Sequence, residues 1–171
     1  MIKKPGMKVA GEKTRGLTAK KTENFSEWYS QVIEKAEIVD LRLGIKGFVT
    51  VRPWGTIMIE KLYDMFEKEL QSKGHLPVIM PSVIPESNLK KEASHVQGFT
   101  PEVFWIEREK DSKEEKLALR PTSETLFTPM FALWVRSHRD LPLKLYQRGS
   151  VFRYDTKATM PLVRGREFQW I

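Results

Sequence analysis

The chain contains no cysteine, which excludes disulfide bonds and cysteine-ligated zinc within its 171 residues. It also lacks a run of about eighteen apolar residues, the length that a membrane-spanning helix needs. The first 21 residues hold no apolar segment of the kind found in secretory signals. The three histidines, His75, His95 and His138, lack the spacing of metal ligands, so we interpret each as structural or exposed. We therefore expect a protein of the cytoplasm with no membrane partner.

Glycine-rich loops of the phosphate-binding kind are absent as well, which argues against a Rossmann or P-loop nucleotide site. What the chain does contain is the composition of a globular protein, with 40% hydrophobic and 30% charged residues. Its length suits one domain that buries roughly two-thirds of its unfolded surface.

The net charge of +7 is concentrated in the first 21 residues. This segment carries seven lysines and arginines against one glutamate, which accounts for +6 of the total. We interpret residues 1–21 as a basic, disordered leader. The alternative is a weak electrostatic contact with RNA or another polyanion, without the interleaved aromatic residues that would give base specificity. The predicted domain then spans residues 22–171.

Hydrophobic periodicity predicts two helices in the first half of the domain. The first begins after Asn24, which has the spacing of a capping box with Glu27, and ends near residues 37–41. The second spans about 55–72 and stops at Gly74, a residue suited to a helix end. The apolar stripe of the second helix consists of Met58, Leu62, Met65, Phe66 and Leu70.

Two further helices are predicted in the second half. A short polar helix is expected over residues 86–96, and a longer helix over 123–138. Pro129 either kinks the longer helix or marks a late start. Its expected buried face consists of Leu126, Phe127, Met130, Phe131, Trp134 and Val135.

Strand patterns alternate with these helices. Prolines bracket the apolar strand at 76–81, which places it at an edge or an interface because proline removes a ladder donor. The other expected strands lie at 44–51, 103–106, 116–119, 143–154 and 166–171. This order predicts an α+β fold, with a mainly antiparallel sheet flanked by helices.

Two short signatures carry the chemistry. The first is Arg120-Pro121-Thr122-Ser123-Glu124, and the second is a strand–loop–strand with Val-Phe-Arg-Tyr-Asp at 151–155 and Leu-Val-Arg-Gly-Arg-Glu-Phe at 162–168. Arginine offers a planar fork that matches carboxylate and phosphate oxygens. An acid two residues from a threonine can hold an ammonium group, and an aromatic at a strand end can stack on a base. Together these groups suit an amino acid bound beside a nucleotide.

With these residues in view, the chain resembles the front part of the catalytic domain of prolyl-tRNA synthetases of the archaeal and eukaryotic kind. These enzymes are class II aminoacyl-tRNA synthetases. The resemblance covers about residues 15–171 and includes the segments 47–54, 95–105 and 137–142. It implies ATP-dependent activation of L-proline to prolyl-adenylate and transfer of the prolyl group to tRNA(Pro).

The helix at 55–72 and the strand ending at Pro81 resemble class II motif 1. The resemblance implies a homodimer formed through residues 55–81. The alternative is an ordinary amphipathic core helix, since both need the same apolar stripe.

The second signature resembles motif 2, and the resemblance implies a role for each of its residues. Arg153 would contact the α-phosphate of ATP and the amino-acid carboxylate, as the catalytic residue that offsets negative charge. Asp155 stands where the family usually has glutamate and would hold the adenine side, with a shorter reach. The remaining implied ATP contacts are Arg164, Gly165 and Phe168, the last stacking on adenine. The alternative is a solvated basic face, although six basic residues between 144 and 166 against one aspartate would repel one another without an anionic ligand.

The first signature resembles the loop that selects proline. Thr122 and Glu124 would hold the proline nitrogen, with the glutamate countering its ammonium charge. Phe99 and Trp170 would supply apolar walls for the ring, and Glu102 lies on the same segment as Phe99. The alternative for Glu124 is an acid that stabilises a helix N-terminus, which is compatible with the first role.

The resemblance further implies that magnesium enters with ATP, held by phosphate oxygens and water, without a protein-ligated metal. The sequence ends before the region where the family has motif 3 and an anticodon-binding domain. We therefore expect the 171 residues alone not to activate proline at a useful rate. Two alternatives are a catalytically inactive, synthetase-like binding or regulatory module, and a small domain whose basic face meets an acidic partner.

Overall fold

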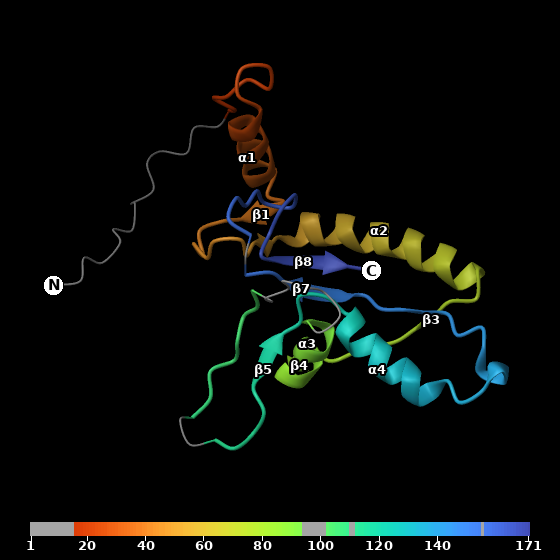
Figure 1. The fold of residues 1–171 in the computed structure, drawn as a ribbon. Helices are drawn as coiled ribbons and strands as arrows, with labels where there is room; N and C mark the ends of the chain where they lie inside the picture. Colours follow the sequence, from red (N-terminus) through yellow and green to blue (C-terminus); the bar gives the residue numbers. More distant parts are fainter. Residues whose placement is uncertain (1–15, 94–101, 110–111, 155) are drawn as a thin grey trace.

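The computed structural model describes residues 16–93, 102–109, 112–154 and 156–171. This described part contains four α-helices and eight short strands (Figure 1). The strands pair two by two, three pairs antiparallel and one parallel, instead of forming one continuous sheet. The predicted α+β class is confirmed. Within the described part, no helix combines the length and the apolar character that crossing a membrane requires.

The first helix, α1 (Phe25–Lys35), begins at its predicted cap. The side chain of Asn24 accepts a hydrogen bond from the backbone N–H of Glu27 at 3.1 Å. The helix ends slightly before the predicted region 37–41. Glu37 takes a left-handed backbone conformation, with φ of 57°, through which an α-helix does not continue.

A short antiparallel pair follows α1. Strand β1 (Val39–Asp40) pairs with β2 (Thr50–Val51), so only the end of the predicted strand 44–51 is extended. Gly44 and Gly47 both have positive φ, 72° and 83°, and fold the intervening residues into turns. Glycine therefore shortens the strand here by turning the chain twice.

Helix α2 (Pro53–Ser72) has proline at its first position, where the fixed φ suits a helix and the missing N–H costs nothing. Gly55 and Tyr63 are its buried residues. Gly74, with φ of 79°, follows the helix end as predicted. The predicted apolar stripe does not pack into the core of this chain, because four of its members are exposed: Met58, Leu62, Met65 and Phe66.

The next strand forms the parallel pair. Strand β3 (Leu76–Pro77) is shorter than the predicted 76–81 and pairs with β6 (Leu145–Tyr146). The N–H of Val78 donates to the carbonyl of Tyr146 at 2.9 Å. The chain between these strands thus leaves and returns at neighbouring points.

The segment between β3 and β6, residues 78–144, is called the excursion below, and it contains an antiparallel strand pair and a short helix. Strand β4 (Val83–Pro85) pairs antiparallel with β5 (Leu117–Leu119), and α3 (Glu86–Ala93) follows β4 directly. The predicted strand at 103–106 is reduced to a single bridge between Trp105 and Ala118. The helix agrees closely with the predicted 86–96.

Helix α4 (Glu124–Trp134) continues through Pro129 but stops before the predicted end at residue 138. Val135 is extended, and Ser137 caps a separate 3-10 turn, η1 (His138–Asp140). A new cap at Ser137 requires a break in the helix, which is the physical reason for the shorter element. Leu126 of the predicted face is buried, and Trp134 is exposed.

The last two strands form the predicted strand–loop–strand. Strand β7 (Gly149–Phe152) pairs antiparallel with β8 (Glu167–Trp170), and Val151 stands opposite Phe168. Figure 1 shows β8 lying along α2, with β7 between β8 and the excursion. The pair therefore forms the boundary between two halves of the fold.

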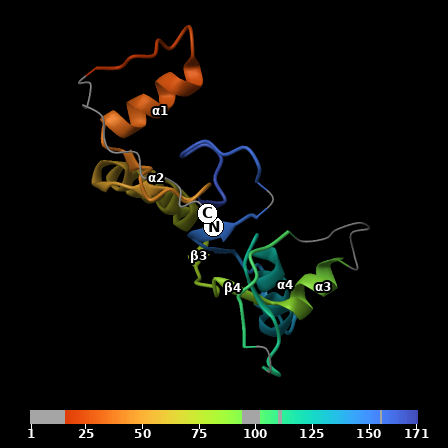
Figure 2. The same ribbon diagram turned by 90° about the vertical axis from the view of Figure 1, so that its left-hand side faces the viewer.

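A compact core holds the excursion together. It consists of Met80, Ile84, Leu89, Val103, Ala118 and Leu126. Figure 2 shows α3, α4 and β4 on one side, well away from α1 on the other. The residues between β3 and β6 thus form one packed part, and the helices α1 and α2 belong to the other.

Candidate active site

The two signatures meet at one backbone hydrogen bond. The N–H of Phe152, at the end of β7, donates to the carbonyl of Arg120 at 2.9 Å. Thr122 and Glu124 lie shortly after Arg120 in the sequence, and Arg153 directly follows Phe152. This pairing places the start of the first signature beside the start of the motif-2-like loop.

Arg120 itself is a buried cation with only 3% of its surface exposed. Its Nε donates to the carbonyl of Ser150 at 2.8 Å, and its Nη1 donates to the carbonyls of Met80 at 3.0 Å and Pro81 at 3.1 Å. Burial lowers the pKa of the Arg120 guanidinium from its usual value. The sequence pattern assigns no role to Arg120, because no residue near it in the sequence indicates that its side chain is buried.

Gln147 is a second buried polar residue that the sequence did not single out. Its Oε1 accepts a hydrogen bond from the N–H of Met80 at 2.9 Å, and its Nε2 lies 3.5 Å from the hydroxyl oxygen of Ser123. Gln147 therefore ties β6 and β7 to the loop of the first signature. Its position just after an apolar strand was the only available signal.

Thr122 is partly buried, and Glu124 is the exposed first residue of α4. The side chain of Ser123, at the N-cap, makes no capping hydrogen bond. Glu124 therefore occupies the favourable end of the helix dipole while its carboxylate faces solvent. Among the described residues no ion pair joins Glu124 to Arg153, so the acid does not neutralise the arginine.

Arg153 lies against the aromatic residues of β8. Its guanidinium carbon is 5.4 Å from the ring centre of Phe168 and 5.5 Å from that of Trp170. Its N–H donates to the carbonyl of Arg166 at 2.7 Å, which closes the base of the loop. The structure therefore brings together three of the predicted site residues, with a cation over aromatic rings.

Arg164 and Gly165 lie at the C-terminal end of this loop, directly before Arg166. The N–H of Arg164 donates to the carbonyl of Met160 at 2.8 Å. A Cβ on Gly165 would lie 2.6 Å from the carbonyl oxygen of Glu167 and 3.1 Å from that of Gly47. Glycine at 165 thus lets the loop pack closely against the turn that contains Gly47. A cavity of about 220 Å³ is lined by residues of both that turn and the loop.

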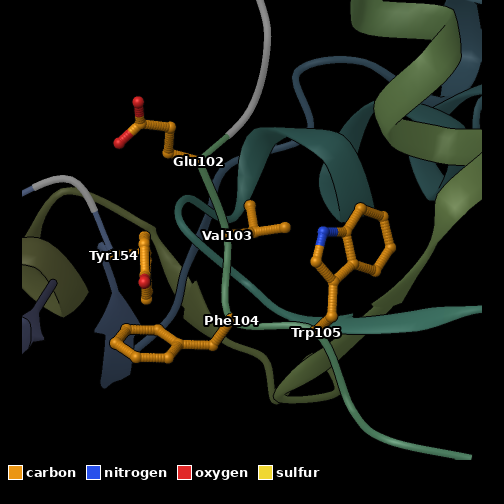
Figure 3. Close-up of a pocket in the computed structure, with 5 residues that line it drawn as sticks. All are labelled: Glu102, Val103, Phe104, Trp105 and Tyr154. Atoms are coloured by element: carbon orange, nitrogen blue, oxygen red, sulfur yellow. The ribbon is translucent and has the colours of Figure 1, made fainter.

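A larger hollow of about 580 Å³ lies beside the residue that follows Arg153. Figure 3 shows Phe104 and Tyr154 together on one side of the segment 102–105, with Trp105 on the other. The rings of Phe104 and Tyr154 meet edge to face, 5.2 Å apart between centres. Glu102 also lines this hollow, so the acid that shares a segment with Phe99 lies near the motif-2-like strand.

Two predicted site residues, Phe99 and Asp155, lie outside the described residues. In the described part there is no group of three histidine, aspartate or glutamate side chains arranged to hold a metal ion. The predicted site residues that the structure describes are Thr122, Glu124, Arg153, Arg164, Gly165, Phe168 and Trp170.

Comparisons with known proteins find relatives of this chain in one family of enzymes. Residues 104–171 match the family described as the tRNA synthetase class II core domain (G, H, P, S and T). A proline–tRNA ligase of Thermofilum pendens is 56% identical over 158 residues, which covers 92% of this chain and 33% of that protein. The chain thus spans about a third of the length of this relative.

Solved structures give the same result. The prolyl-tRNA synthetase of Cryptosporidium parvum, complexed with halofuginone and AMPPNP, matches with a TM-score of 0.82 and 39% identity, over 93% of this chain and 31% of that one. The Giardia lamblia prolyl-tRNA synthetase, in complex with prolyl-adenylate, matches with a TM-score of 0.79 and 46% identity, over 85% and 30%.

The fold and the two signatures are those of the class II aminoacyl-tRNA synthetase core. The identity of 56% to a proline–tRNA ligase indicates which family within this class the chain belongs to. Within it, the chain belongs to the prolyl-tRNA synthetase family, of the archaeal and eukaryotic kind, and corresponds to part of the catalytic domain.

Proposed function

We propose that the protein carrying this chain activates L-proline with ATP and transfers the prolyl group to tRNA(Pro) in the cytoplasm. The observation that carries the proposal is the hydrogen bond between Phe152 and Arg120, which joins the Thr122–Glu124 loop to the strand that bears Arg153. The solved relative bound to prolyl-adenylate supports the same substrate pair.

In the first step, a proline carboxylate oxygen attacks the α-phosphorus of ATP. A bond forms between that oxygen and phosphorus, and the bond to the bridging oxygen breaks, so that pyrophosphate leaves with the electron pair. Arg153 supplies fixed positive charge where negative charge develops on the reacting oxygens, without taking or giving a proton. In the second step, the terminal hydroxyl oxygen of the tRNA bonds to the prolyl carbonyl carbon, the bond from that carbon to the phosphate oxygen breaks, AMP leaves with the electron pair, and the hydroxyl proton is released to solvent.

Selection of proline rests on the first signature. Glu124 offers a carboxylate to the secondary ammonium, and the hydroxyl oxygen of Thr122 accepts a further hydrogen bond from the same nitrogen. Trp170 supplies an apolar wall for the ring, together with Phe99. The close approach of Trp170 to Arg153, 5.5 Å from ring centre to guanidinium carbon, supports one binding site for the ring and the carboxylate.

The nucleotide is assigned to the motif-2-like loop. Phe168 provides a flat ring for adenine, Arg164 and Gly165 contact ATP from the loop end, and Asp155 takes the adenine side. Magnesium arrives as MgATP, whose phosphate oxygens and water supply most of its ligands.

We further propose a homodimer formed through residues 55–81. The exposed apolar stripe of α2 supports it, because soluble monomers rarely leave such a stripe uncovered. Met65→Asp, at a position 69% exposed, should shift the full-length protein from dimer to monomer in sedimentation velocity. Leu43→Asp, at a position 68% exposed outside this region, is the matched control and should leave the dimer intact.

The decisive experiment for the activity is proline-dependent exchange of pyrophosphate into ATP by the full-length protein. We expect exchange with proline and none with serine, threonine or glycine. The isolated 171 residues serve as the comparison and should show no useful exchange. Binding of a prolyl-adenylate analogue without any exchange would point instead to a catalytically inactive module.

A further inference from the structure

Arg120 connects two parts of the site that belong to differently packed halves of the molecule. Thr122 and Glu124 lie in the excursion between β3 and β6, whereas Arg153 follows β7. Arg120 lies two residues before Thr122, and its own carbonyl accepts the N–H of Phe152, the residue before Arg153. It is therefore the point in the described chain where the first signature contacts the second.

The contacts of Arg120 run in both directions from this point. Toward the excursion, its N–H donates to the carbonyl of Ser82 at 3.0 Å, and its Nη1 donates to the carbonyls of Met80 and Pro81. Toward the strand pair, its Nε donates to the carbonyl of Ser150 at 2.8 Å. One rigid guanidinium plane thus spans two backbone segments, a geometry that the single ammonium of lysine cannot reproduce.

A glycine completes the arrangement. A Cβ on Gly149 would lie 2.3 Å from the Nη2 of Arg120, closer than any real contact allows. Because Arg120 is only 3% exposed, its guanidinium has no room to withdraw into solvent. Glycine at 149 thus leaves the space that the guanidinium of Arg120 occupies.

We propose that Arg120 is a positioning residue for amino-acid recognition, which sets the Thr122–Glu124 loop at its working separation from Arg153. This role rests on the proposed function, because it acts on the grip of proline between these groups. Arg120 touches neither substrate in the proposal. It acts by fixing the two backbone segments on which the substrate-binding groups stand.

The test is Arg120→Met in the full-length protein, with steady-state pyrophosphate exchange as the readout. Because displacement of a reacting group by about 1 Å can cost about a hundredfold, we expect the KM for proline to rise by about tenfold or more. The KM for ATP should change much less. Arg42→Met is the matched control: Arg42 is exposed and pairs with Asp40, so its replacement should leave both KM values unaltered.

Gly149→Ala gives an independent route that leaves every donor of Arg120 in place. It should raise the KM for proline in the same direction, by displacing the guanidinium. In the Arg120→Met background the added methyl has no Nη2 to meet, so Gly149→Ala should then add little further loss. Gly16→Ala, where a Cβ would meet nothing within 4 Å, is the control for the glycine substitution.

The outcomes separate this inference from the proposed function. Lack of proline-dependent exchange in the unaltered protein would overturn the proposed function and the role of Arg120 with it. Normal exchange together with an unchanged KM for proline in both variants would overturn the role of Arg120 alone. Additive losses in the double variant would equally contradict it, since the two residues would then act separately.

Discussion

The guanidinium of Arg153 lies 5.4 Å from the ring centre of Phe168, at the open end of the β7–β8 pair. Phe168 lies on β8 and Arg153 directly follows β7, and the hydrogen bond from the N–H of Arg153 to the carbonyl of Arg166 lies beside them. The arginine is thus oriented by the same hairpin that presents the aromatic ring. The guanidinium that we propose to contact the nucleotide and the proline carboxylate is therefore held by the hairpin before any ligand binds.

Arg153→Lys keeps the positive charge but removes the planar fork and its contact with the rings. We expect kcat/KM for pyrophosphate exchange to fall by about a hundredfold or more, the usual cost of losing one donor aimed at developing charge. Arg42→Lys, on an exposed pair with Asp40, should leave the rate unaltered. A drop of less than threefold for the lysine variant would contradict the proposed role of Arg153.

Glu124→Gln removes the charge that is proposed to face the proline ammonium, while preserving the shape of the side chain. Loss of a hydrogen bond to a charged group costs about 1.5–3 kcal/mol, so the KM for proline should rise by at least about tenfold. The KM for ATP should stay within about twofold. Equal increases in both KM values would show that Glu124 serves the fold and not the selection of proline.

Gly47→Ala tests the packing between the turn and the loop. Gly47 has φ of 83°, and an added Cβ would lie 2.6 Å from the Cγ of Arg166. We expect the free energy of unfolding to fall by about 1–3 kcal/mol, measured by urea denaturation. Gly16→Ala should have little effect, because a Cβ there meets nothing within 4 Å.

Ile84→Ala tests the core of the excursion. Ile84 is completely buried, so its truncation should lower the free energy of unfolding by about 2–5 kcal/mol. Leu43→Ala, at a position 68% exposed, should change it by less than about 0.5 kcal/mol. Similar losses at both positions would contradict the assignment of a core between β3 and β6.

Tyr63 gives a pH dependence of known sign. Burial raises the pKa of the Tyr63 hydroxyl above its ordinary value of 10.0. The folded state therefore holds this proton more tightly than the unfolded state does. The contribution of Tyr63 to stability is complete below about pH 10 and is lost as the pH rises through the folded pKa.

The comparison between the protein and its Tyr63→Phe variant isolates this effect. The stability difference between them should be constant from pH 7 to about pH 9 and should change in favour of the phenylalanine variant above about pH 10. Urea unfolding at each pH measures it. A difference that stays level across this range would show that the pKa of Tyr63 is not raised by folding.

Local signals in the sequence predicted the elements well. Asn24 caps α1 as its spacing with Glu27 indicated, and Gly74 follows the end of α2. The strand–loop–strand of the second signature is also confirmed. Each of these features depends on residues within a few positions of one another, so the sequence pattern contains the information that decides them.

Features that depend on residues far apart in the sequence were not predicted. The parallel pairing of β3 with β6 joins Leu76 to Leu145, and no local pattern selects that partner. The inward turn of Arg120 depends on carbonyls at Met80, Pro81 and Ser150. A buried arginine and an exposed one look the same in a sequence, and only the tertiary acceptors tell them apart.

The parallel pairing of β3 and β6 has a mechanical consequence. The described residues of the excursion connect to the rest of the chain through two strands that lie side by side. A small rotation about that attachment would carry Thr122 and Glu124 together and leave Arg153 behind. The separation between the acid and the arginine therefore depends on the contacts that cross between the two parts, which include the hydrogen bond from the guanidinium of Arg120 to Ser150 and the edge-to-face rings of Phe104 and Tyr154.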